Sequence, residues 1–166
     1  MAHTATLSVC IDPGIESEEG MYAESDSVGH STTGFVLMLA GCPIVYSSKR
    51  QPCIALSSTE AEIIAASTTA AEICYVRTLL AEMGLEQEEP TVLYVDNSGA
   101  VELARDRKSC HRSRHVDRRF FKVRELEASG VLRVRHIPTE RNRADLLTKA
   151  LTLDAFRRHR ASLMRA

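Results

Sequence analysis

The sequence has no paired cysteines, no long apolar run and no secretion signal, and each absence excludes a class of protein. Its five cysteines are scattered, odd in number and never spaced as C-x-x-C. This excludes a zinc ribbon or a disulfide scaffold and predicts a reducing compartment. No unbroken apolar run approaches the roughly 18 residues of a membrane span, so we expect a soluble chain with no membrane partner. Residues 1–10 lack both the basic start and the apolar stretch of a secretion signal.

What is present is the composition of one ordinary domain with a very uneven charge. The chain has 166 residues, of which 44% are hydrophobic and 26% are charged, which is enough to bury a core. Residues 1–104 hold 3 Lys and Arg against 15 Asp and Glu, whereas residues 105–143 hold 13 against 5. This asymmetry favours a cation-binding site beside a surface for a polyanion, although a solvated basic helix would give the same counts.

Periodicity and turn residues predict a mixed α/β domain of two or three layers. The strands are expected at 33–39, 43–48, 91–96 and 131–137, with a short extended piece at 21–24. The helices are expected at about 56–83, 98–104, 116–128, 142–150 and 153–164. The short turn between the first two strands indicates an antiparallel hairpin, and the helical connections after it imply parallel pairing of the later strands.

Three acidic residues stand where strands end or helices begin, and each has two interpretations. Asp96 ends the most apolar strand and could bind a metal or cap the next helix. Glu62 could be a ligand or the capping-box partner of Thr59. Asp145 could join the same site or form a local ion pair with a neighbour such as Lys149. Clustered carboxylates repel one another unless a cation compensates them, and Mg²⁺ prefers such oxygen ligands.

Seven short motifs occur in order along the chain and together point to one family. They are STTGF at 31–35, SSKRQP at 47–52, ALSSTEAE at 55–62, LYVDN at 93–97, HRSRHVD at 111–117, IPTE at 137–140 and ADLLTK at 144–149. The series strongly resembles the ribonuclease H domain at the end of copia-type retrotransposon reverse transcriptases, over about residues 20–150. The resemblance implies a ribonuclease H-like α/β fold, a mixed five-stranded sheet of three antiparallel and then two parallel strands, flanked by helices.

The resemblance also implies a chemistry, namely two-metal-ion cleavage of the RNA strand of RNA–DNA hybrids. The two ions would be Mg²⁺, with Mn²⁺ as a substitute, held by four acidic residues. Three of the four positions fall on Glu62, Asp96 and Asp145. The first position, an Asp in the family, falls on Glu24, and Asp26 and Asp12 are the lower-ranked alternatives. Glu places its oxygens more than an ångström away, and such a misplacement can cost about a hundredfold in rate.

The same resemblance suggests partners and boundaries. Arg112, Arg114, Arg118, Arg119 and Lys122 would contact backbone phosphates of the hybrid. His136 and His115 are weaker candidates for proton transfer or product release. Residues 1–19 would be a connection from the polymerase domain or an extension of the first strand, residues 20–150 the domain itself, and residues 151–166 a C-terminal amphipathic helix. The family implies a cytoplasmic virus-like particle or the nucleus as the location.

Two other functions stay open at this point. A catalytically impaired descendant could bind nucleic acid or a protein partner without cutting, and Glu24 in the first ligand position supports this alternative. A third interpretation is a structural subdomain that only supports a polymerase, which predicts an apolar face and self-association.

Overall fold

The protein is described here by a computed structural model, which covers residues 7–14, 30–105 and 114–164. Its five-stranded sheet has the order β3-β2-β1-β4-β5. The strands are β1 (Leu7–Gly14), β2 (Thr32–Leu39), β3 (Cys42–Arg50), β4 (Thr91–Val95) and β5 (Leu132–His136). The β1–β2 and β2–β3 pairs are antiparallel, and the β1–β4 and β4–β5 pairs are parallel. This sheet confirms the predicted α/β fold class.

Strand β1 lies at the centre of the sheet, between an antiparallel and a parallel neighbour. Its Val9 and Ile11 have 0% exposure and belong to the main hydrophobic core. The sheet therefore begins at Leu7, inside the segment 1–19 that the sequence set apart as a connection or a first-strand extension. The extended piece expected at 21–24 lies outside the described residues.

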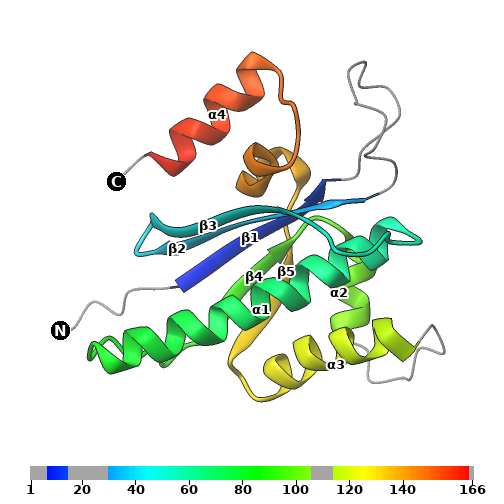
Figure 1. Cartoon of the computed structure of the whole chain (residues 1–166). Coiled ribbons are helices and arrows are strands. Elements are labelled where there is room, and N and C mark those ends of the chain that lie inside the picture. The colour runs from blue at the N-terminus through cyan, green and yellow to red at the C-terminus, as the bar shows by residue number, and fades with distance from the viewer. Residues whose placement is uncertain (1–6, 15–29, 106–113, 165–166) are drawn as a thin grey trace.

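One face of the sheet is covered by α1 (Ser58–Glu82), α2 (Ser98–Arg105) and α3 (Arg114–Ala128), which enclose the main hydrophobic core (Figure 1). Helix α1 begins where Ser57 Oγ accepts a hydrogen bond from the Glu60 amide at 3.2 Å. The Glu60 carboxylate in turn accepts from the Leu56 amide at 2.8 Å. These two residues fill the capping role, so the interpretation of Glu62 as the partner of Thr59 is wrong, and Glu62 is left for another purpose.

Helix α1 is also long and apolar enough to cross a membrane by length and composition, with a mean hydropathy of 1.3 over its most apolar stretch. Isolated polar residues interrupt its sequence, so it contains no unbroken apolar run of that length. In the fold half of that stretch is buried, and Ala65, Ala70 and Ile73 are fully enclosed against the sheet. The apolar character of the helix is therefore accounted for by its core position.

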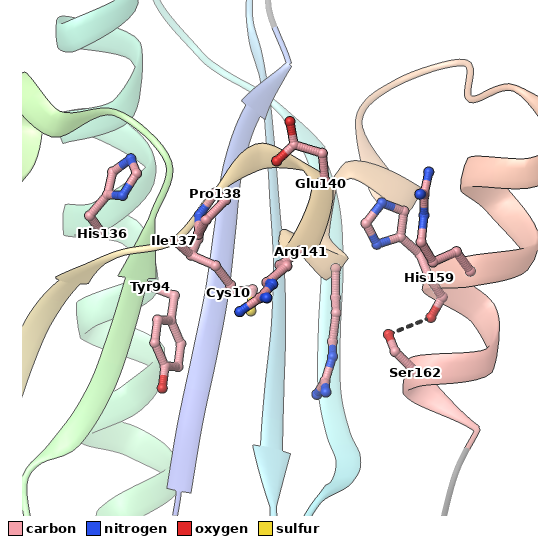
Figure 2. A pocket seen from close by; sticks show the side chains of 11 residues that line it. Cys10, Tyr94, His136, Ile137, Pro138, Glu140, Arg141, His159 and Ser162 are labelled. Atoms are coloured by element: carbon pink, nitrogen blue, oxygen red, sulfur yellow. Dashed lines mark hydrogen bonds between the residues drawn. The ribbon is translucent and has the colours of Figure 1, made fainter.

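The other face of the sheet carries two short 3₁₀ helices, η1 (Thr139–Arg141) and η2 (Arg143–Leu147), and then α4 (Leu153–Leu163). The α-helix predicted at 142–150 is wrong, because this segment winds as a 3₁₀ turn that Asn142 caps through the Ala144 amide. Helix α4 packs on η2. Between α4, η1 and the sheet lies a cavity of about 580 Å³ (Figure 2).

Candidate metal centre

Three aspartates from three separate elements meet at one edge of the sheet. Asp12 lies near the end of β1, Asp96 follows β4, and Asp145 lies in η2. Each offers a carboxylate oxygen, and these oxygens all lie within 4.8 Å of one another. The geometry follows from the topology, because β1 and β4 are parallel neighbours and their carboxyl ends reach the same edge. The strands β1 and β4 thus position Asp12 and Asp96, and η2, on the other face of the sheet, positions Asp145.

Glu62 adds a fourth carboxyl group from the first turns of α1. Its side chain is 2% exposed, and its Oε2 is a buried atom without a hydrogen-bond partner. Burial, followed by the hydrogen bond and charge of Asp96 and then the charge of Asp12, raises the pKa of Glu62 to about 11. Without a metal the carboxyl group is therefore protonated at neutral pH and shares a hydrogen bond with Asp96.

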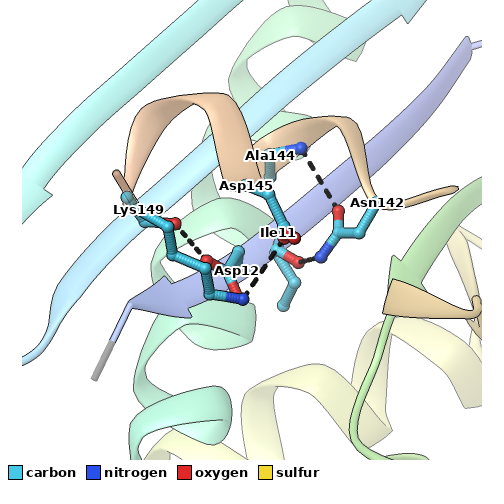
Figure 3. Close-up of polar contacts among 7 residues, drawn as sticks. Ile11, Asp12, Asn142, Ala144, Asp145 and Lys149 are labelled. Carbon is cyan, nitrogen blue, oxygen red and sulfur yellow. Dashed lines mark hydrogen bonds and ion pairs between the residues drawn. The ribbon is translucent and has the colours of Figure 1, made fainter. Parts of the chain in front are cut away.

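Lys149 joins two of these acids from the end of the ADLLTK motif. Its Nζ lies 3.0 Å from Asp12 Oδ1 and 3.4 Å from Asp145 Oδ1 (Figure 3). The hydroxyl of Thr148 donates a short hydrogen bond to the other oxygen of Asp12. Burial first and then the charge of Asp12 raise the pKa of Asp145 to about 6, although Lys149 opposes the shift. The predicted ion pair of Asp145 with Lys149 is thus confirmed, but it forms inside the carboxylate cluster rather than apart from it.

Asn142 holds the third acid in place from within the core. It has 0% exposure, and its Nδ2 donates to the Ile11 carbonyl at 2.8 Å while its Oδ1 accepts from the Ala144 amide at 3.2 Å (Figure 3). The side chain therefore fastens η2 to β1 directly beside Asp12 and Asp145. Its place in the chain carried no signal for this role, because the partner strand lies 131 residues away.

Asp96 is free of the capping role that the sequence also allowed. Asn97 performs it, since its Oδ1 accepts from the Ala100 amide at 3.1 Å at the start of α2. The ring of His136, at the end of β5, lies 3.2 Å from the backbone oxygen of Asp96 through Nε2. His136 is therefore next to the cluster, whereas the side chain of His115 lies outside the described part of α3.

The four carboxyl groups are suited to divalent cations. A pocket of about 250 Å³ is lined by three of them, Asp12, Glu62 and Asp96, together with Lys149. The unpartnered Oε2 of Glu62, and the burial and carboxylate repulsion that raise the pKa values of Glu62 and Asp145, fit a site that can accept a cation. Hard oxygen donors from carboxylates are the ligands that Mg²⁺ prefers.

Several predicted site residues cannot be compared with this geometry. Glu24, Asp26 and Arg112 lie outside the described residues, and for Arg114 and Arg118 only the backbone of α3 is described. Arg119 is half-buried and donates to the Cys53 thiol at 3.5 Å, whereas Lys122 is exposed on α3. Asp12, ranked third from the sequence, is the acid that lies beside Asp96 and Asp145.

A signal for Asp12 was present in the sequence. Both Leu7–Ile11 and Val92–Val95 are apolar runs closed by an aspartate. Two such runs in parallel, adjacent strands place their acids side by side, which is the arrangement observed.

The chain is similar in sequence to segments of transposon polyproteins. It is 37% identical over 140 residues to the Retrovirus-related Pol polyprotein from transposon TNT 1-94 of Nicotiana tabacum, which covers 81% of this chain and 10% of the relative. It is 35% identical over 161 residues to the corresponding polyprotein from transposon RE1 of Arabidopsis thaliana, covering 94% and 11%. The chain thus spans about a tenth of the length of these curated relatives. No protein-family model matches it.

Solved structures show the same fold at low sequence identity. LC11-RNase H1, isolated from compost by a metagenomic approach, has a TM-score of 0.62 at 18% identity, covering 86% of this chain and 92% of the other. The same enzyme in complex with an RNA/DNA hybrid has a TM-score of 0.53 at 19% identity, covering 86% and 94%. The native protease-reverse transcriptase of prototype foamy virus has a TM-score of 0.53 at 10% identity and covers 100% of this chain and 22% of the other.

Proposed function

This chain belongs to the ribonuclease H domains of retrotransposon Pol polyproteins, and from that premise we propose that it is an endoribonuclease that cuts the RNA strand of RNA–DNA hybrids. The observation that carries the proposal is the meeting of Asp12, Asp96 and Asp145 within 4.8 Å, with buried Glu62 beside them. A structural domain gains nothing from gathering four acids, three of them buried, because the buried acids lose hydration and all four repel one another.

The four acids would hold two Mg²⁺ ions, with Mn²⁺ as a substitute. When bound, such ions activate a water molecule and stabilise the leaving oxygen of a phosphodiester. In the chain itself, Asp12 and Asp96 present their carboxylates from rigid strand ends, and Asn142 holds η2 so that Asp145 faces them. We assign the first ligand position to Asp12 rather than to Glu24 or Asp26.

Two observations support the proposed substrate, the complex of a fold neighbour and the charge of the chain. LC11-RNase H1 has been solved with an RNA/DNA hybrid, and we extend that substrate to this chain. The basic residues predicted for phosphate contact, Arg112, Arg114, Arg118, Arg119 and Lys122, fall around α3, and Lys122 is exposed there. The 2′-hydroxyl groups of the RNA strand would distinguish it from DNA.

The polyprotein relatives suggest the context in which the domain works. We propose that its partner is the polymerase domain of a reverse transcriptase in the same polyprotein, and that it degrades the RNA strand during reverse transcription. Cys10, Cys42, Cys53 and Cys74 are free thiols, in keeping with a reducing compartment, which we take to be the cytoplasm with its virus-like particle or the nucleus.

Replacing Asp96 with Asn tests the function directly. The amide keeps the shape of the side chain but removes the charge that holds a cation, so we expect cleavage to fall by about a hundredfold or more. A labelled hybrid is incubated with Mg²⁺, with Mn²⁺ or with chelator, and the RNA products are resolved on a gel. Asp154→Asn, an exposed acid in the first turn of α4, is the matched control and should cleave normally.

The same assay separates the candidates for the first ligand. We expect Asp12→Asn to lose as much activity as Asp96→Asn, and Glu24→Gln and Asp26→Asn to lose far less. Full activity in Asp12→Asn or Asp96→Asn would contradict the two-metal assignment, whereas loss in Glu24→Gln alone would return the first position to that residue.

The ion pairs of Lys149 favour a second candidate function. An ammonium group already compensates Asp12 and Asp145, so an impaired domain could keep its fold and bind a hybrid without cutting it. This candidate predicts hybrid binding with a steep salt dependence that Mg²⁺ does not change, and no product even with Mn²⁺.

A further inference from the structure

The cavity of about 580 Å³ beneath α4 is more than twice as large as the acidic pocket and has the opposite charge. Three arginines line it, Arg141 from η1, Arg143 from η2 and Arg158 from α4. Glu140 is the acidic residue in its lining. In Figure 2 the Glu140 carboxylate is directed away from the Arg141 side chain. None of the three guanidinium groups forms an ion pair within residues 7–14, 30–105 and 114–164.

This arrangement concentrates positive charge. The guanidinium groups of exposed Arg141 and Arg158 and of half-buried Arg143 repel one another around the cavity. Buried His159 experiences the same field, because burial and then the charges of Arg158 and Arg143 lower its pKa. A bound anion would offset the repulsion, and the planar fork of a guanidinium matches the paired oxygens of a phosphate.

The cavity does not have the properties of a second catalytic site. Its Cys10 thiol is buried, and burial raises its pKa, so the group stays protonated and is a poor nucleophile. Apart from Glu140, its polar side chains are cationic or neutral, which suits the binding of an anion. The size exceeds what a single phosphate needs, and the half-buried ring of Tyr94 in the lining offers an aromatic surface to an attached nucleoside.

The cavity adjoins the acidic cluster through one residue. His136 lines the cavity, and its ring contacts the backbone oxygen of Asp96, which lines the acidic pocket. We propose that the cavity formed by Arg141, Arg143 and Arg158 binds a nucleotide phosphate. This phosphate has one of two sources. It belongs to the nucleic-acid strand that occupies the acidic cluster, in which case the inference rests on the proposed function, or it belongs to a free mononucleotide.

Two double variants with equal loss of charge test the inference. Arg141→Ser with Arg158→Ser removes two cations from the cavity, whereas Arg135→Ser with Arg157→Ser removes two exposed cations that do not line it. Binding of a labelled hybrid is measured in metal-free buffer over a range of salt concentrations. If the strand supplies the phosphate, the cavity variant should bind about tenfold more weakly and show a salt slope smaller by about one to two, and the control should change much less.

A second arm uses small probes. Inorganic phosphate and adenosine 5′-monophosphate are titrated into the metal-free wild type and both variants by calorimetry at constant ionic strength. If the source is a free nucleotide, adenosine 5′-monophosphate binds the wild type, the cavity variant loses about tenfold in affinity, and hybrid binding is unchanged. The variant Arg141→Lys with Arg158→Lys keeps the charge but not the fork, and gives the test if the serine variant does not fold.

The outcomes distinguish this inference from the proposed function. If the wild type cuts the hybrid but the cavity and control variants match in both arms, the cavity is not a phosphate site and the enzyme assignment stands. If the wild type neither binds nor cuts the hybrid, the proposed function fails, and the small-probe arm alone supports or overturns the phosphate site.

Discussion

At the scale of single residues, Lys149 is the side chain whose removal should have opposite effects on the metal-free and metal-bound chain. In Lys149→Met the nearly buried Asp12 loses its charged partner, which we expect to destabilise the metal-free chain by about 1–2 kcal/mol. The affinity for Mg²⁺ should rise, because no internal cation competes for Asp12 and Asp145. Thermal unfolding in chelator and calorimetric titration with Mg²⁺ measure the two effects.

Lys122→Met is the matched control for this variant, since Lys122 is exposed on α3 away from the cluster. Unchanged metal-free stability in Lys149→Met would mean that the ion pairs contribute nothing, and weaker Mg²⁺ binding would mean that Lys149 supports the site instead of competing for it.

The acids differ in how well the sequence revealed them. Asp96 and Glu62 could be placed because each follows a strong local pattern, an apolar strand and a helix start. Asp12 was ranked low because the resemblance matched the first acid to Glu24, in the segment before the STTGF motif, and local periodicity does not show which strands pair. Asn142 could not be found at all, since its role is one hydrogen bond to a strand distant in sequence.

At the scale of elements, η2 is held against the sheet from two sides. Asn142 fastens it to β1, and Gly34 of β2 lies so close beneath it that a Cβ atom there would be 3.1 Å from Leu147 Cβ and 3.2 Å from the Ala144 oxygen. Asn142→Leu leaves a buried carbonyl and a buried amide unpaired, at a cost of about 2–3 kcal/mol. Gly34→Ala should push η2 outward.

We expect both variants to reduce hybrid cleavage by more than their loss of stability explains, because each displaces Asp145 from its partners. Activity measured well below the unfolding temperature, together with the unfolding curve itself, separates the two effects. Thr139→Ala, at an exposed position in η1, should change neither. If cleavage follows stability alone, η2 does not position the acid.

Sequence periodicity was sufficient to predict some of the helices and strands but not η2. The hairpin, the long helix α1 and the two later strands were predicted close to their observed bounds, because their patterns are long or strictly alternating. The segment at 142–150 has apolar residues at helical spacing, yet it winds as a short 3₁₀ turn because Asn142 and Gly34 set its distance from the sheet.

At the scale of the whole molecule, the uneven charge of the sequence is seen in two pockets. His136 links them, because it lines the cavity and contacts the backbone oxygen of Asp96, which lines the acidic pocket. The carboxylates of the acidic pocket come from β1, α1 and the end of β4, whereas the three arginines of the cavity come from η1, η2 and α4. The counts predicted a cation site beside an anion surface, but not that η2 would supply Asp145 to the acidic cluster and Arg143 to the cavity. The positions of the two pockets depend on the chain crossing to the other face of the sheet after β5, where η1, η2 and α4 lie. Amino-acid composition carries no information about this crossing.

The stability of the whole chain should therefore depend on pH in a way that a bound cation reverses. Glu62 and Asp145 have pKa values raised to about 11 and about 6. A raised pKa means that the folded state holds the proton more tightly, so the metal-free chain should lose stability as pH rises, from about 4 to 6 for Asp145 and further for Glu62. Mg²⁺ requires deprotonated ligands, so its affinity should increase over the same range.

Glu62→Gln should flatten the pH profile of metal-free stability between pH 6 and 9, whereas Glu82→Gln, exposed on the same helix, should not. Unfolding temperatures recorded with chelator and with Mg²⁺ decide the matter, and parallel profiles for the wild type and Glu62→Gln would show that the buried carboxyl group does not govern the response.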